Sequence, residues 1–87
     1  MSISATKLEP LASDVEVSRG RLHVTLMDGR ELSVPLSWFP RLKNASPSQR
    51  KQWELIGGGI GIHWPLLDED ISVENLLAPR SIRRQYE

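Results

Sequence analysis

The sequence predicts an α+β fold, with a small antiparallel sheet of two N-terminal hairpins plus a later strand, and two short helices. Three observations predict it. Residues 14–34 alternate apolar and polar side chains across two glycine-containing turns, which is typical of half-buried hairpins. Residues 60–64 alternate in the same way. Finally, Ser46 and Ser72 each precede a segment with helical spacing of apolar residues.

The register of each hairpin follows from the requirement that the apolar side chains share one face. A two-residue loop at Arg19-Gly20 meets this requirement in the first hairpin. In the second hairpin a two-residue loop would turn Leu32 to the wrong face, whereas a loop of residues 27–29 places it opposite Val24. We therefore predict the three-residue loop, with Gly29 in the left-handed conformation.

The first helix is predicted from its N-terminal signals. Ser46 and Gln49 have the spacing of a capping box, and a proline occupies the first helical position between them. The helix is expected to continue to Ile56 and to end at the glycines 57–59. Residues 36–42 favour a short 3₁₀ piece before it, and residues 4–11 are a further strand candidate.

The second helix is predicted to follow Ser72 as its cap, with its stop at Pro79. Its expected buried side consists of Val73, Leu76 and Leu77. The acids that precede it would lie at the positive end of the helix dipole, which gives them a structural reason to be there.

The composition limits the classes of function. The chain has 87 residues, no cysteine and a formal net charge of zero, so disulfides and thiolate chemistry are excluded and no global attraction to nucleic acid is expected. The uncharged run 55–67 is shorter than the ~20 residues that span a bilayer, and the N-terminus does not resemble a signal peptide. We expect a cytoplasmic protein without membrane contact, with a single domain at residues 1–79 and a basic tail at 80–87.

Charges are nevertheless sorted along the chain. Residues 37–53 contain four bases and no acid, and residues 66–78 contain four acids and no base. Two interpretations are open: the blocks are solvated faces that attract each other, or one of them is a partner surface.

The segment 57–77 has the residue types of several kinds of site, but not their arrangement. A phosphate loop leads from a strand into a helix, and the order predicted here is the reverse. A single histidine, His63, near Asp68, Glu69 and Asp70 does not form a recognised metal motif, and no serine lies in a nucleophile motif. We therefore expect no catalytic residue, no metal and no cofactor.

Two stretches, "VTLMDGRELSVPLSWFPRL" and "GGGIGIHWPLLDEDISVENLL", resemble the bacterial domain-of-unknown-function family 2442 (DUF2442) over about residues 3–78. The resemblance implies a small α+β fold, related to an N-terminal domain of some bacterial regulators, and no established activity. It also implies a neighbouring gene for a small partner protein, in pairs suspected of being toxin–antitoxin modules. Other members continue into a helix-turn-helix, for which residues 79–87 are too few.

We therefore expect a non-enzymatic protein–protein interaction module that acts as the antitoxin-like or regulatory half of a two-gene pair. Exposed strand edges on a small sheet also suit a homodimer of the chain. One alternative is a DNA-associated regulator acting through residues 37–53 and the tail, although direct nucleic acid binding is not favoured. Another is a small homo-oligomeric ligand-sensing domain. The predicted partner-binding residues are His63, Trp64, Asp68, Glu69, Asp70, Arg80, Arg83 and Arg84.

Overall fold

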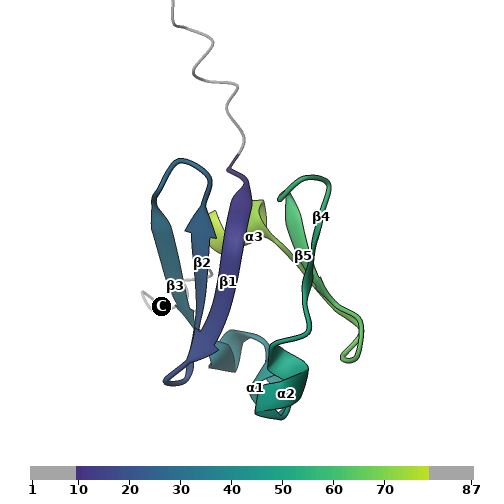
Figure 1. The fold of residues 1–87 in the computed structure, drawn as a ribbon. Coiled ribbons are helices and arrows are strands. Elements are labelled where there is room, and N and C mark those ends of the chain that lie inside the picture. The colour runs from purple at the N-terminus through teal and green to yellow at the C-terminus, as the bar shows by residue number, and fades with distance from the viewer. Residues whose placement is uncertain (1–9, 79–87) are drawn as a thin grey trace, which may run out of the picture.

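The computed structural model describes residues 10–78, which form two three-stranded antiparallel sheets with short helical segments between and after them (Figure 1). The first sheet contains β1 (Ala12–Ser18), β2 (Arg21–Leu26) and β3 (Glu31–Pro35), and the second contains β4 (Glu54–Ile56), β5 (Gly61–Trp64) and β6 (Glu69–Ser72). The helical segments are η2 (Leu36–Trp38), α1 (Pro40–Lys43), α2 (Pro47–Arg50) and α3 (Val73–Leu77). The α+β class is confirmed, but the prediction of a single sheet is wrong, because the C-terminal half builds a second sheet.

Both predicted hairpin registers of the first sheet are confirmed. Arg19 and Gly20 have φ angles of 54° and 73°, and this two-residue turn pairs Ser18 with Arg21. In the second hairpin, the amide of Leu26 donates to the carbonyl of Arg30 at 2.7 Å, which closes the three-residue loop. The apolar side chains of the three strands consequently share one face, as the alternation requires.

The predicted helix from residue 47 to Ile56 is wrong in its length. The capping box of Ser46 and Gln49 forms, but α2 ends at Arg50 and residues 54–56 are β4. Strand pairing with β5 lets Leu55 pack against the core beside Ile62, so tertiary contacts override the local signal. The glycines 57–59 all have positive φ and form the turn between β4 and β5, not the end of a helix.

The acidic segment before α3 is also different from the prediction, because it contains a strand. Asp68 lies in the turn 65–68, whereas Glu69 and Asp70 begin β6, which pairs with β5. The predicted cap is confirmed, since Ser72 Oγ accepts from the amide of Asn75 at 3.0 Å. Leu77 is 44% exposed, which corrects its assignment to the buried side of α3.

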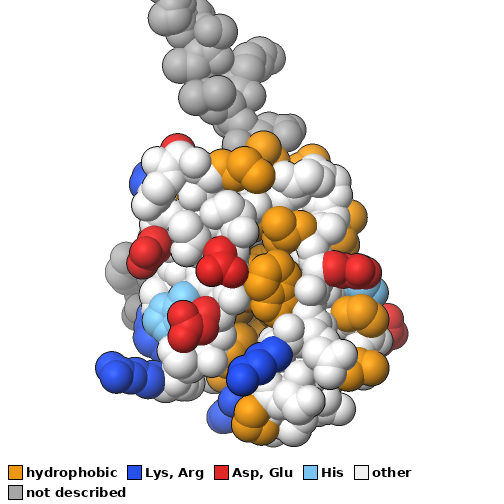
Figure 2. Space-filling view, in the orientation of Figure 1, with side chains coloured by type: hydrophobic (Ala, Val, Ile, Leu, Met, Phe, Trp, Pro, Cys, Tyr) orange, Lys and Arg blue, Asp and Glu red, His pale blue; other side chains and the backbone are white. Residues whose placement is uncertain are grey.

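The core lies between the two sheets and is closed by the helical segments (Figure 1). Figure 2 shows hydrophobic side chains reaching the surface along the seam between the two sheets. Its largest fully buried side chains are Trp64, Leu22, Leu42, Ile62, Val24 and Val73. Trp64 Nε1 donates to the carbonyl of Arg50 at 3.1 Å, so the indole joins the second sheet to α2. The other two tryptophans, Trp38 and Trp53, are partly buried and pack against the core.

The two sheets meet at the start of β1. The amide of Ala12 donates to the carbonyl of Gly59 at 2.8 Å, and Gly59 has a φ of 115°. A Cβ atom on Gly59 would lie 2.6 Å from the Ala12 carbonyl oxygen and 2.9 Å from its nitrogen. Pro10 and Leu11 are not in a strand, and the rest of the strand candidate 4–11 lies outside the described residues.

We predict that Gly59→Ala lowers the free energy of unfolding by about 3 kcal/mol, because the Ala12 backbone must move and a left-handed conformation is strained. Gly58→Ala is the matched control: its φ is 72°, and its added Cβ meets no atom within 4 Å. It should cost only about 1 kcal/mol, the conformational part alone. Urea unfolding of both variants tests this. Equal losses would contradict the role given to the Ala12–Gly59 contact.

Candidate functional site

The outer face of the second sheet presents a row of ionisable side chains. Along β5 the side chains of Ile62 and Trp64 point into the core, so Gly61 and His63 point outward. The register places Glu54 of β4 and Asp70 of β6 on either side of His63. Glu54, His63 and Asp70 therefore cross the three strands in one line, and we call them the outer row.

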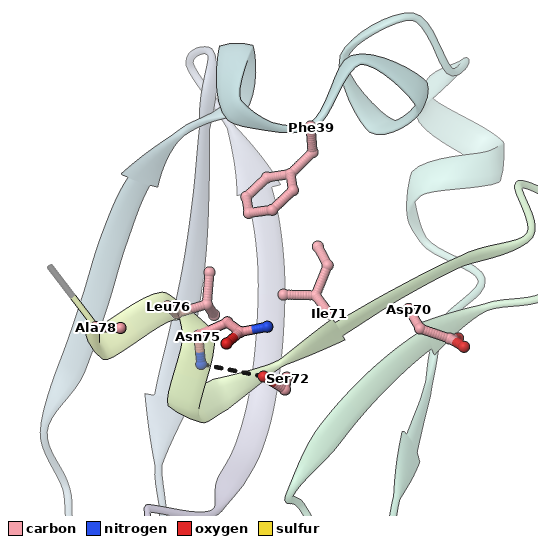
Figure 3. Close-up of a pocket in the computed structure, with 7 residues that line it drawn as sticks. All are labelled: Phe39, Asp70, Ile71, Ser72, Asn75, Leu76 and Ala78. Atoms are coloured by element: carbon pink, nitrogen blue, oxygen red, sulfur yellow. Dashed lines mark hydrogen bonds between the residues drawn. The ribbon is translucent and has the colours of Figure 1, made fainter. Parts of the chain in front are cut away.

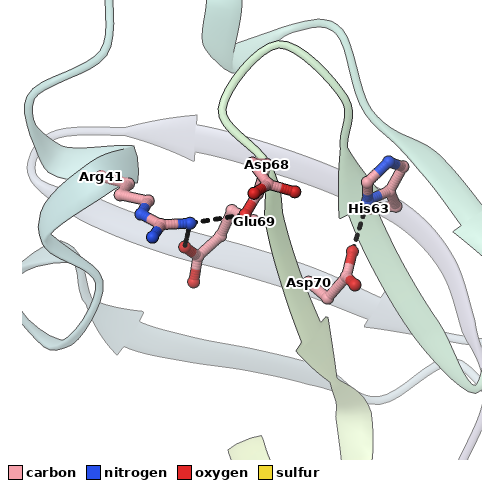
Figure 4. A network of polar contacts seen from close by, with 5 residues as sticks. All are labelled: Arg41, His63, Asp68, Glu69 and Asp70. Atoms are coloured by element: carbon pink, nitrogen blue, oxygen red, sulfur yellow. Dashed lines mark hydrogen bonds and ion pairs between the residues drawn. The ribbon is translucent and has the colours of Figure 1, made fainter.

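His63 and Asp70 are in direct contact within the outer row, through Nδ1 and Oδ1 (Figure 4). The hydrogen bond to Asp70 raises the pKa of His63 above its ordinary value of 6.5, and the negative charges of Asp70 and Glu54 act in the same direction. The imidazole is 28% exposed and the carboxylate 71% exposed, so water reaches both partners. The pair favours the imidazolium form of His63.

On the opposite face of β6, the acidic residues 66–78 contact the basic residues 37–53, which we call the basic block. Arg41 Nη1 donates to the carbonyl oxygen of Asp68 at 2.6 Å and lies 4.0 Å from Glu69 Oε1 (Figure 4). The Glu69 side chain is only 19% exposed, because its strand position faces the same side as Trp64. The expected attraction between residues 37–53 and 66–78 is therefore present at this contact.

An apolar hollow of ≈ 250 Å³ adjoins the outer row on the same face of the sheet. It is lined by Ile56, Gly57, Ile60, Gly61, Asp70, Ile71 and Ser72. Ile56 and Ile60 are 44% and 47% exposed, and Gly61 lies opposite Ile56 without a side chain to fill the space between the strands. We call Ile56, Ile60 and Gly61 with their surroundings the isoleucine hollow.

A second hollow, of ≈ 270 Å³, lies between β6, α3 and Phe39 (Figure 3). Ile71 and Leu76 point into it, and Asn75 borders it at the start of α3. Asp70 also contributes to its lining, but the Asp70 side chain points away from Phe39 and Leu76 and toward His63. This hollow therefore has an apolar wall and a polar edge, with its acid turned to the other face.

The structure brings some of the predicted site residues together and separates others. His63 and Asp70 meet on the outer face, whereas Asp68 and Glu69 meet Arg41 on the other side of β6. Trp64 is fully buried, which corrects its assignment to a partner surface: the alternation of β5 turns it inward. The predicted tail residues Arg80, Arg83 and Arg84 lie outside the described residues.

Sequence reasoning missed the part of the face that β4 contributes. Glu54 and Ile56 were assigned to the predicted helix, and Ile60 to the first position of the strand predicted at residues 60–64. The alternation of Trp53, Glu54 and Leu55 was the signal that could have found Glu54, since it turns the carboxylate to the side opposite the two apolar residues.

Residues 10–78 contain no group of three or more histidine and acidic side chains placed to hold a metal ion. No helix in that same range is long and apolar enough to cross a membrane.

Comparison with known proteins identifies relatives across nearly the whole chain. The family described as "protein of unknown function (DUF2442)" matches residues 12–81, which confirms the resemblance seen in the sequence. A protein of unknown function from Rhodospirillum rubrum is 30% identical, with a TM-score of 0.70 over 86% of this chain and 98% of that chain. An uncharacterised protein from Chromobacterium violaceum shares the fold at 22% identity, with a TM-score of 0.66 over 87% and 75% of the two chains. None of the curated proteins matches the chain.

The His63–Asp70 contact predicts a specific titration. The pKa of His63 is higher in the folded chain than its ordinary value of 6.5. The His63–Asp70 contact therefore stabilises the fold fully below about pH 6.5, and this stabilisation is lost as the pH rises through the folded-state pKa. Asp70→Asn should lower the pKa of His63 toward its ordinary value, measured by the NMR shifts of the imidazole carbons. Asp68→Asn is the control, because Asp68 contacts Arg41 through its backbone carbonyl. An unchanged His63 titration in Asp70→Asn would contradict the pairing.

Proposed function

The chain belongs to the DUF2442 family, and we propose that it is a non-enzymatic protein–protein interaction module of the cytoplasm. We further propose that it acts as the antitoxin-like or regulatory half of a two-gene pair. The observation that carries the proposal is the outer face of the second sheet, where exposed isoleucines adjoin the outer row.

The exposed isoleucines support binding because they lie together. Ile56 and Ile60 line one hollow, whereas isolated surface apolar residues need no functional explanation. Ile56 is paired with Gly61 in the strand register and Ile60 directly precedes Gly61 in the chain, so the sheet positions both side chains. An apolar patch with a charged border has the composition of a small protein interface, with an apolar centre and a polar rim.

The exposure of the carboxylates favours binding over acid–base catalysis. The Asp70 side chain is 71% exposed and Glu54 is also exposed, so neither is enclosed. Acid–base catalysts are tuned by enclosure in a dry site, whereas carboxylates at an interface rim steer and select a partner of opposite charge. The face therefore suits a basic partner protein.

The alternative of a DNA-associated regulator receives less support from the basic block. Arg50 donates to the carbonyls of Leu42 and Lys43, and Arg41 is engaged with Asp68 and Glu69. Two of the four bases in residues 37–53 are thus occupied within the chain, which reduces the charge available for phosphates.

The test is co-expression of the tagged chain with the neighbouring gene in the native host, followed by purification and mass spectrometry. We expect one small protein in stoichiometric amount, and its recovery should fall at least about tenfold for Ile56→Ser/Ile60→Ser, because apolar anchors dominate interface energies. The control is Met27→Ser, a change at another exposed apolar residue, which lies in the turn between β2 and β3 and is 60% exposed.

The melting temperatures of both variants are measured beside the recovery. Loss of the partner only in the isoleucine variant, with little change in melting temperature, supports the proposed interface. Equal recovery from both variants would remove the outer face from the proposal. Recovery of the chain alone, as a multimer, would favour the homo-oligomeric alternative.

A further inference from the structure

The isoleucine hollow and the outer row form one continuous surface. Asp70 and Ser72 point to the same side of β6, and Asp70 lines the hollow while its carboxylate also contacts His63. Gly61 forms part of the floor, and a Cβ atom there would lie 3.4 Å from the carbonyl oxygen of Ile71. The surface therefore consists of an apolar trough with the Asp70 carboxylate beside it, turned toward His63.

We propose that the isoleucine hollow is a docking site for a lysine side chain of a basic partner protein, with Asp70 as the counter-ion of the ammonium group. This inference rests on the proposed function and names the partner's chemistry. The chemical reason is that a lysine side chain has an aliphatic stem and a charged end, which match the apolar trough and the carboxylate beside it.

Charge complementarity supports a cationic occupant over an anionic or neutral one. The outer face presents two carboxylates, Glu54 and Asp70, and no lysine or arginine lines the hollow among the described residues. An acidic side chain would meet these like charges, and an apolar one would leave the carboxylates without a new partner. Asp70 is mostly exposed and contacts its neighbour through one oxygen, which leaves its other oxygen for a ligand.

His63 is the competing cation within the chain. The charged groups that face it are Asp70 from β6 and Glu54 from β4, and both favour its protonated form. Protonated His63 neutralises part of the charge that a lysine would use. Deprotonation removes this competition, so the affinity for a lysine side chain rises as the pH rises through the raised pKa of His63.

The probe is a blocked Ala-Lys-Ala peptide, added to the full ¹⁵N-labelled chain and followed by amide chemical shifts. The control peptide carries norleucine in place of lysine, which has a similar aliphatic stem and no ammonium. We expect saturable shifts centred on Gly61 and Asp70, with affinity for the lysine peptide about two- to fivefold above norleucine, the range of an exposed ion pair. The affinity should also be about two- to fivefold higher above the titration midpoint of His63, located from its imidazole carbon shifts, than below that midpoint, since lysine stays charged on both sides of it.

Two variants separate the roles of the outer row. Asp70→Asn should bring the lysine peptide down to the affinity of the norleucine peptide. His63→Gln should keep lysine binding and remove its pH dependence. His63 is partly exposed and Asp70 is mostly exposed, so neither substitution should unfold the chain. The comparison of the lysine and norleucine peptides on the unaltered chain also tests the site without any substitution.

Shifts spread over the whole surface, equal binding of the two peptides, or a pH dependence that persists in His63→Gln would each overturn the inference. Its failure is distinguishable from failure of the proposed function. If co-expression recovers a partner but the lysine peptide leaves Gly61 unshifted, only the lysine site is lost. If the peptide binds and no protein partner is recovered, the site stands and the interaction module does not.

Discussion

The hydrogen bond from Ala12 to Gly59 is the contact on which the arrangement of the two sheets depends. It joins the first strand of one sheet to the turn that connects β4 and β5 in the other. The close approach requires a residue without a side chain, and the φ of 115° requires the same residue. On the other side of this turn, the amide of Val73 donates to the carbonyl of Ile60 at 2.9 Å, which extends the pairing of β5 with β6. The turn 57–60 is therefore held from both sides, and this fixes the position of the isoleucine hollow.

The sequence was sufficient to predict the parts of the fold that local rules determine. Both hairpin registers could be derived by keeping apolar residues on one face, and both serine caps formed as their spacing indicates. A capping box, however, specifies only the first turn of a helix. The conformation of the next residues depends on where Trp53 and Leu55 find an apolar surface, and pairing with β5 provides it. The capping box does not contain that information, so the predicted helix was too long.

The residues of the candidate site were predictable only in part, and their geometry was not predictable. The sequence indicates His63 and the acids 68–70, yet their contacts depend on β6. This strand was not predicted, because the acids were interpreted as part of a helix cap. Strand alternation in β6 sends Asp70 to one face and Glu69 to the other, and the alternation of β5 buries Trp64. Glu69 and Asp70 are therefore adjacent in the sequence but lie on opposite faces of the sheet and contact different residues.

Because Glu69 and Asp70 lie on opposite faces of β6, only part of the negative charge of residues 66–78 is available to a partner. Arg41 lies beside the Glu69 carboxylate and the Asp68 carbonyl, so part of the negative block is already matched within the chain. Asp70 is the acid of β6 that faces the hollow. The other carboxylate of this face, Glu54, lies on the far side of His63 and belongs to neither charged block. The negative character of the outer face thus comes from residues brought together by strand pairing. Recognition of this face by a partner depends on the register of the second sheet. A one-residue slip of β4 or β6 would turn the carboxylate of that strand inward and its core residues outward.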